Sequence, residues 1–100
     1  MLTRDDIIST FEENKKTLKH YGVKKIALFG SYARGDATPD SDVDLLVEFE
    51  QGRGLFRDYT NLISFLEDKL GKPVDVVKTH LVRRELKPHI MGEIKYEARV

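Results

Sequence analysis

The stretch FGSYARGDATPDSDVDLLVEF, residues 29–49, decides the fold of this chain. Its first part places a glycine, Gly30, and a hydroxyl, Ser31, between an apolar run and a short polar segment. Its last part is typical of a strand, and Asp42 and Asp44 then leave the same face, because side chains two residues apart on a strand point the same way. The stretch therefore predicts a strand, a short helix, a loop and a second strand, with groups suited to phosphate and metal at one end.

Three carboxylates are candidates for the chemistry. Asp42 and Asp44 repel each other unless a cation lies between them. Asp75 is expected to be buried in an apolar strand, where a charge is costly unless it is paired or bound to metal. If the two strands are neighbours, the three meet at one sheet edge. Two magnesium ions about 3.5–4 Å apart would then stabilise the attacking and leaving oxygens of an in-line displacement. We predict Asp42, Asp44 and Asp75 as catalytic and metal-binding residues, with Asp75 also suited to accept or orient the proton of the attacking hydroxyl. The competing interpretation of Asp42 and Asp44 is a solvated acidic pair beside the turn at residues 39–41.

Three further residues are candidates for nucleotide binding. Gly30 allows a sharp turn and a close approach of the backbone to phosphate. Ser31 is predicted to cap the helix that follows and to offer its hydroxyl to a phosphate oxygen. Arg34 comes one turn later, where it would add positive charge over a triphosphate. A salt bridge from Arg34 to Asp36 or Asp40 is the alternative.

The spacing of apolar residues, together with glycine and proline, predicts the other elements. The expected order is helix 3–20, strand 24–29, short helix 31–34, loop 35–41, strand 42–49, helix 55–70, strand 73–77, a short helix 81–86 and, after an interruption at Pro88, a last helix through residues 90–98. The helix at 3–20 is expected to begin with a capping box formed by Thr3 and Asp6. The predicted fold class is α/β (α+β): a small mixed sheet of three to four strands flanked by helices, in a single domain over residues 1–100.

Composition narrows the function classes. The chain has 100 residues, and its 17 basic and 17 acidic side chains cancel. A neutral chain lacks the basic stripe of most nucleic-acid-binding proteins, so we expect no direct nucleic-acid binding. The absence of cysteine excludes disulfides and thiolate metal sites. With no signal-peptide pattern and no apolar run of roughly eighteen residues, we expect a cytoplasmic protein without a membrane span.

The motif resembles that of the minimal nucleotidyltransferases in the DNA polymerase β superfamily. Their signature is Gly-Ser, a spacer, Asp-x-Asp and a third acid on a neighbouring strand. It stands here as Gly30, Ser31, Asp42, Asp44 and Asp75, and the similarity covers roughly residues 20 to 80. The resemblance implies transfer of a nucleoside monophosphate from a triphosphate to a hydroxyl, with two magnesium ions and release of pyrophosphate.

The small size and the SYARG segment are similar to the antitoxins encoded beside HEPN-domain ribonuclease toxins. That resemblance implies a type VII-like system, in which AMP is transferred from ATP to a hydroxyl, usually of tyrosine, on the partner toxin, and a hetero-oligomer with that toxin. Two alternatives remain open: a catalytically silent, nucleotide-binding antitoxin that acts by occlusion, and a nucleotidyltransferase acting on a small molecule or an RNA end. The intact acidic triad argues against the first. Neutral charge and the lack of a second domain argue against the second.

Overall fold

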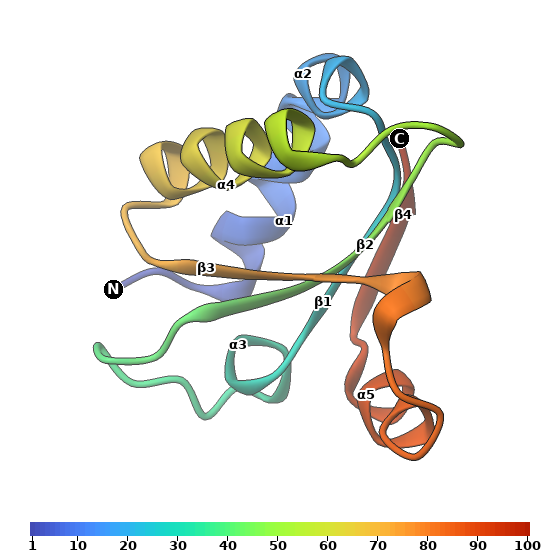
Figure 1. Cartoon of the computed structure of the whole chain (residues 1–100). Helices are drawn as coiled ribbons and strands as arrows, with labels where there is room; N and C mark the ends of the chain where they lie inside the picture. Colours follow the sequence, from blue (N-terminus) through green and yellow to red (C-terminus); the bar gives the residue numbers. More distant parts are fainter.

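A computed structural model describes residues 1–100, and its centre is a four-stranded mixed sheet in the order β3-β2-β1-β4 (Figure 1). β1 is antiparallel to both β2 and β4, whereas β2 and β3 are parallel. The strands are β1 (Val23–Phe29), β2 (Val43–Phe49), β3 (Val74–Lys78) and β4 (Tyr96–Arg99). The predicted fold class, a small mixed sheet flanked by helices, is confirmed.

Helices on one side of the sheet build the core. The helices are α1 (Arg4–Glu13), α2 (Lys15–His20), α3 (Ser31–Arg34), α4 (Phe56–Leu70) and α5 (Lys87–Glu93), with a 3-10 turn η1 (Thr79–Leu81). Apolar side chains from α1, α2, α3 and α4 pack with those of β1, β2 and β3 in one cluster of 16 buried residues. α5 has no buried residue and lies apart from α1 and α4 (Figure 1). None of these helices is both long enough and apolar enough to cross a membrane.

The first helical segment differs from the prediction in one respect. The capping box is confirmed, because the Thr3 hydroxyl accepts from the Asp6 amide at 3.1 Å and the Asp6 carboxylate accepts from the Thr3 amide at 2.9 Å. The prediction of one continuous helix over 3–20 is wrong, because the helix breaks at Asn14, which has φ −121° and ψ 25°. The Asn14 side chain donates to the Thr10 carbonyl at 2.8 Å, and such local side-chain bonds compete with helical geometry.

The start of α4 is held by a local ion pair. Asp58 accepts from Arg53 Nε at 2.8 Å and from the Gly54 amide at 3.0 Å. These bonds lower the pKa of Asp58 from 3.8 to about 2, and the bond from Arg53 contributes most. The Arg53 side chain also donates to the His20 carbonyl at 2.7 Å, so the glycine-containing loop before α4 is tied to the end of α2.

Asp58→Asn is expected to destabilise the protein at neutral pH by about 1 kcal/mol, a value discounted for the partial exposure of the pair. Because the folded-state pKa of Asp58 is depressed, its contribution is present above pH 3.8 and is lost as the pH falls toward about 2. Urea unfolding of the variant and the wild type, at neutral pH and again near pH 2, would measure the difference in their free energies of unfolding. Asp68→Asn, on the exposed side of the same helix, is the matched control. An equal loss in both variants, or a loss that persists in acid, would contradict the assignment.

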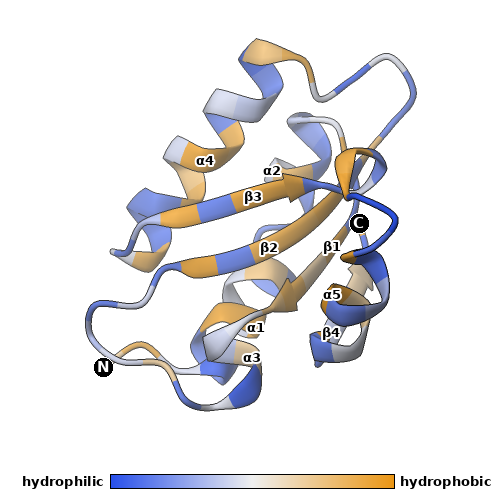
Figure 2. Ribbon diagram, turned by 60° about the horizontal axis from the view of Figure 1, so that its bottom comes forward, coloured by the Kyte–Doolittle hydropathy of each residue, from blue (hydrophilic) through white to orange (hydrophobic).

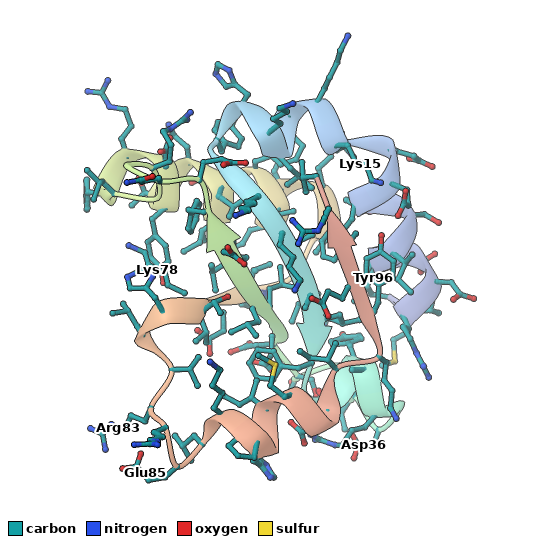
Figure 3. The ribbon with its side chains drawn as sticks, turned by 90° about the vertical axis from the view of Figure 1, so that its right-hand side faces the viewer. Lys15, Asp36, Lys78, Arg83, Glu85 and Tyr96 are labelled. Atoms are coloured by element: carbon teal, nitrogen blue, oxygen red, sulfur yellow. The ribbon has the colours of Figure 1, made fainter.

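The C-terminal part departs most from the prediction. The expected helix at 81–86 is absent: only η1 is helical there, and Arg83 and Glu85 project from an exposed connection (Figure 3). Pro88 does not interrupt a helix but lies in the first turn of α5, where its missing N–H costs no intrahelical bond. α5 ends at Glu93, so the helix predicted through residues 90–98 is wrong in its second half.

That second half is the edge strand β4. Tyr96 and Ala98 are half-buried while Glu97 and Arg99 are exposed, an alternation of period two. The Tyr96 ring lies 6.0 Å from the Phe11 ring of α1, and its hydroxyl donates to Glu12. Burial, with the Glu12 carboxylate beside it, raises the pKa of Tyr96 to about 12. Pairing with β1 and this contact with α1 therefore override the weak helical spacing of the tail.

Candidate functional site

All six predicted site residues lie around one open pocket of about 540 Å³, a size within the range of small-molecule sites. The pocket lies where β1 ends, β2 and β3 begin, and α5 passes nearby. Its lining is formed by Phe29, Gly30, Ser31, Arg34, Ser41, Asp42, Asp44, Asp75, Val77, Ile90 and Glu93. The structure thus brings the predicted site residues together, although the first and the last of them, Gly30 and Asp75, are 45 positions apart in the sequence.

The parallel pairing of β2 and β3 sets the carboxylates side by side. The register places Asp44 directly beside Asp75, and Figure 2 shows the resulting hydrophilic band across two otherwise apolar strands. Asp42 lies two residues before Asp44, just ahead of β2. The expectation that Asp75 is buried is wrong: its side chain is exposed, because β3 is an outer strand and this face of it is not covered. The free-energy cost of the ionised Asp75 carboxylate is therefore smaller than expected for a buried charge.

Asp44 is the most perturbed member of the group. It is half-buried, and its pKa is raised above 3.8, first by burial and then by the negative charges of Asp75 and Asp42. The positive charge of Arg34 acts in the opposite direction but does not cancel them. A carboxylate in such surroundings is held ionised most easily by a nearby cation.

The side chains that line the pocket suit a magnesium ion that is bound together with a nucleotide. Four carboxylates and one guanidinium line the pocket, a formal charge of −3, so an anionic triphosphate needs cations to enter. No three His, Asp or Glu side chains are arranged to hold a metal ion by themselves. Magnesium commonly takes one or two protein carboxylates and completes its octahedron with substrate phosphate and water. The donor set therefore suits a metal shared between protein and substrate rather than a closed protein cage.

The glycine turn fixes where Asp44 lies. Gly30 has φ 78° and ψ −157°, and a Cβ built on it would lie 2.2 Å from Oδ2 of Asp44. Phe29 pairs with Asp44 across β1 and β2, so the turn and the carboxylate are in contact by register. The prediction that Ser31 caps α3 is wrong: Gly30 is the N-cap, no side chain caps the helix, and Ser31 is its first residue.

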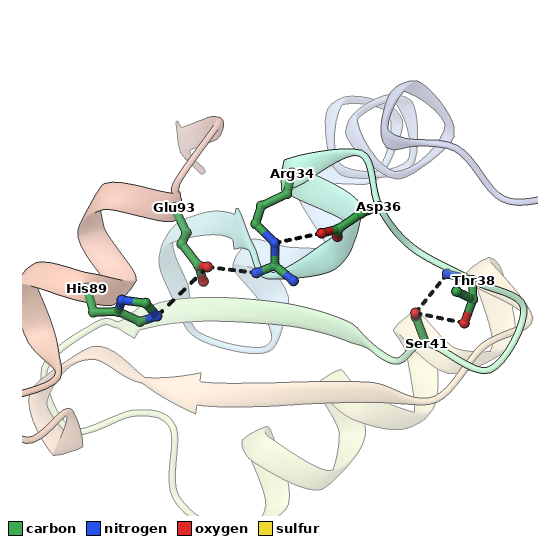
Figure 4. A network of polar contacts seen from close by, with 6 residues as sticks. All are labelled: Arg34, Asp36, Thr38, Ser41, His89 and Glu93. Atoms are coloured by element: carbon green, nitrogen blue, oxygen red, sulfur yellow. Dashed lines mark hydrogen bonds and ion pairs between the residues drawn. The ribbon is translucent and has the colours of Figure 1, made fainter.

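Arg34 lies at the pocket and is also paired. Its Nε donates to Asp36 at 3.2 Å and its Nη1 to Glu93 at 2.6 Å (Figure 4). The predicted alternative of a salt bridge is thus confirmed for Asp36 but not for Asp40. Glu93 was not a predicted site residue. It lies 59 residues from Arg34, in a segment without a motif, so no local signal in the sequence could identify it.

Comparison with known proteins agrees with this geometry. The family model described as "Nucleotidyltransferase domain" matches residues 8–100. A protein of Thermococcus cleftensis named protein adenylyltransferase MntA is 39% identical over 97 residues, which cover 96% of this chain and 97% of the relative. A solved structure described as a proposed minimal nucleotidyltransferase is similar to this chain with a TM-score of 0.81 at 34% identity. The match covers 95% of this chain and 96% of that one.

A second solved structure is described as a toxin–antitoxin with AMP-PNP. It is similar to this chain with a TM-score of 0.65 at 25% identity, over 94% of this chain and 71% of that one. The comparisons assign no role to individual residues, so the roles of the six predicted residues stay predictions.

Proposed function

This chain belongs to the nucleotidyltransferase domain family, and from that premise we propose that it is a protein adenylyltransferase acting as an antitoxin. It transfers AMP from ATP to a hydroxyl of a partner toxin and so neutralises it. The observation that carries the proposal is that Gly30, Ser31 and the three aspartates all line the same pocket. The single buried cluster supports one domain over residues 1–100.

The residues divide into donor-binding and reacting groups. Gly30 lets the backbone approach the triphosphate, Ser31 offers its hydroxyl, and Arg34 supplies positive charge. Asp42 and Asp44, with Asp75, would hold magnesium, which supplies positive charge to the phosphate oxygens when bound.

Transfer forms one bond and breaks one. The acceptor oxygen bonds to the α-phosphorus of ATP, the bond from that phosphorus to the bridging oxygen breaks, and pyrophosphate leaves. Asp75 is exposed at the pocket edge, where it can orient the acceptor hydroxyl and take its proton. Its neighbour Asp44 is more buried and is better suited to the donor side.

The partner is proposed from the relatives and from the resemblance of the motif. The relative from Thermococcus cleftensis is named a protein adenylyltransferase, and a similar fold occurs in a toxin–antitoxin structure with AMP-PNP. We expect the partner to be a HEPN-domain ribonuclease encoded by a neighbouring gene, a tyrosine to accept AMP, and the two chains to form a cytoplasmic hetero-oligomer.

Incubation of this protein with ATP, magnesium and the product of the adjacent gene is expected to raise the partner's intact mass by one or more AMP groups. An ATP analogue with carbon between its α- and β-phosphorus atoms is the control, because its bond cannot be cleaved in this way. Peptide mapping would then locate the modified hydroxyl. An unchanged mass with a partner that is toxic in cells would refute enzymatic neutralisation, and neutralisation without a mass change would favour occlusion.

A further inference from the structure

Arg34 is held by two carboxylates from different parts of the chain. Asp36 is its near neighbour in sequence, but Glu93 reaches it from α5 (Figure 4). The Glu93 side chain is only 20% exposed, against 62% for Asp36 and 44% for Arg34 itself. Glu93 is therefore the better shielded of the two partners, and its contact with Arg34 is the shorter one.

The two carboxylates leave much of the guanidinium free. A guanidinium has five N–H donors. One on Nε is used by Asp36 and one on Nη1 by Glu93, and Nη2 makes no bond to the residues around it (Figure 4). Because Arg34 lines the pocket, these free donors are available to a phosphate oxygen while both carboxylates stay in place.

We propose that Glu93 is a positioning residue, which acts through its ion pair with Arg34 to hold the guanidinium ready for the phosphates of the nucleotide. An exposed arginine loses side-chain entropy when it binds a ligand, and holding it beforehand reduces that loss. Glu93 also joins α5, which has no buried residue, to α3. The inference rests on the ATP-binding part of the proposed function, not on the identity of the partner.

Glu93→Gln is the first test, because it removes the charge and keeps the size. The dissociation constant for magnesium with the non-transferable α,β-carbon analogue of ATP, measured by calorimetry without a partner, is expected to rise about 3–10-fold, as for one lost charge-assisted contact. Glu97→Gln is the matched control. Glu97 also makes an ion pair, with Lys25, but it does not line the pocket that contains Arg34, and its replacement is expected to leave binding unchanged.

A double-mutant cycle separates positioning from a general structural role. In an Arg34→Ala background, Glu93→Gln is expected to change the dissociation constant less than about twofold, because the residue through which Glu93 acts is gone. A second readout needs no nucleotide: the NMR order parameter of Arg34 Nε is expected to fall in Glu93→Gln and to stay the same in Glu97→Gln.

The outcomes separate the two proposals. Tighter nucleotide binding by Glu93→Gln would mean that Glu93 withholds Arg34 from the nucleotide, and would overturn the inference. An unchanged Arg34 order parameter, or an equal effect of Glu93→Gln with and without Arg34, would overturn it as well. Wild-type protein that binds the analogue through this pair but leaves every partner unmodified would refute the proposed transfer alone.

Discussion

Asp44→Asn is expected to abolish AMP transfer, by about 10³-fold or more, while making the folded protein more stable. The loss follows from the place of Asp44 at the centre of the acidic group, beside Asp75 in the register and two residues from Asp42. Removal of one essential group from a catalytic site commonly has an effect of this size. Intact-mass measurement of the partner over time would give the rate.

The gain in stability follows from the pKa of Asp44. Because burial and its acidic neighbours raise that pKa in the folded state, the ionised carboxylate is less favourable in the folded than in the unfolded chain. At pH 7, without magnesium, Asp44→Asn should therefore melt at a higher temperature than wild type, which a thermal unfolding scan would measure. Below pH 3.8 the carboxylate becomes protonated in both states and the difference should disappear.

Two results would contradict this account of Asp44. A variant that is less stable than wild type at pH 7 would show that the carboxylate is satisfied by contacts within the fold. A variant that transfers AMP at near the wild-type rate would remove Asp44 from the site. An inactive variant that still neutralises the toxin in cells would favour occlusion over modification.

Gly30→Ala is expected to have the second large effect, on both stability and activity. The new Cβ would lie 2.2, 2.9 and 3.0 Å from Oδ2, Cγ and Cβ of Asp44. Rotation of the carboxylate relieves the first contact but not the other two, so either the turn or the start of β2 must move. With the added strain of φ 78° for a residue with a side chain, we expect a loss of about 2–4 kcal/mol and no transfer by the protein that remains folded.

Gly52→Ala is the matched control, because Gly52 has φ 76° and nothing lies within 4 Å of the Cβ position. It carries the backbone strain without the collision, so we expect a loss of about 1 kcal/mol and unchanged transfer. Urea unfolding of both variants, together with the mass assay, would measure this. Equal losses at the two positions would mean that the contact between Gly30 and Asp44 contributes nothing.

The part of the site that is local in sequence could be predicted, and the part made by distant contacts could not. Gly30, Ser31, Asp42 and Asp44 lie within a stretch of fifteen residues, where spacing and strand periodicity carry the information. Asp75 could be placed beside them only on the condition that β2 and β3 are neighbours, and its exposure depends on β3 being outermost. Glu93 joins the site through a contact between separate elements, which no pattern in one segment records.

The strand β4, where a helix was predicted, also depends on a contact between distant segments. The residues from Ile94 to Val100 alternate between partly buried and exposed positions, but a stretch this short fits helical spacing nearly as well. Pairing with β1 decides between the two. The break at Asn14 is likewise a competition between a side-chain bond and the helix, whose outcome spacing does not reveal.

The outer position of β3 has a consequence for the choice of acceptor. With Asp75 on the last strand of the sheet, no further strand of this chain walls the reaction centre on that side. In the transfer proposed above, we therefore expect the acceptor molecule itself to form the missing wall and to keep water away from the α-phosphorus. We expect selectivity to come from the fit between two folded surfaces rather than from a closed cavity, so that a free small alcohol is a poorer acceptor than a side chain carried on a protein.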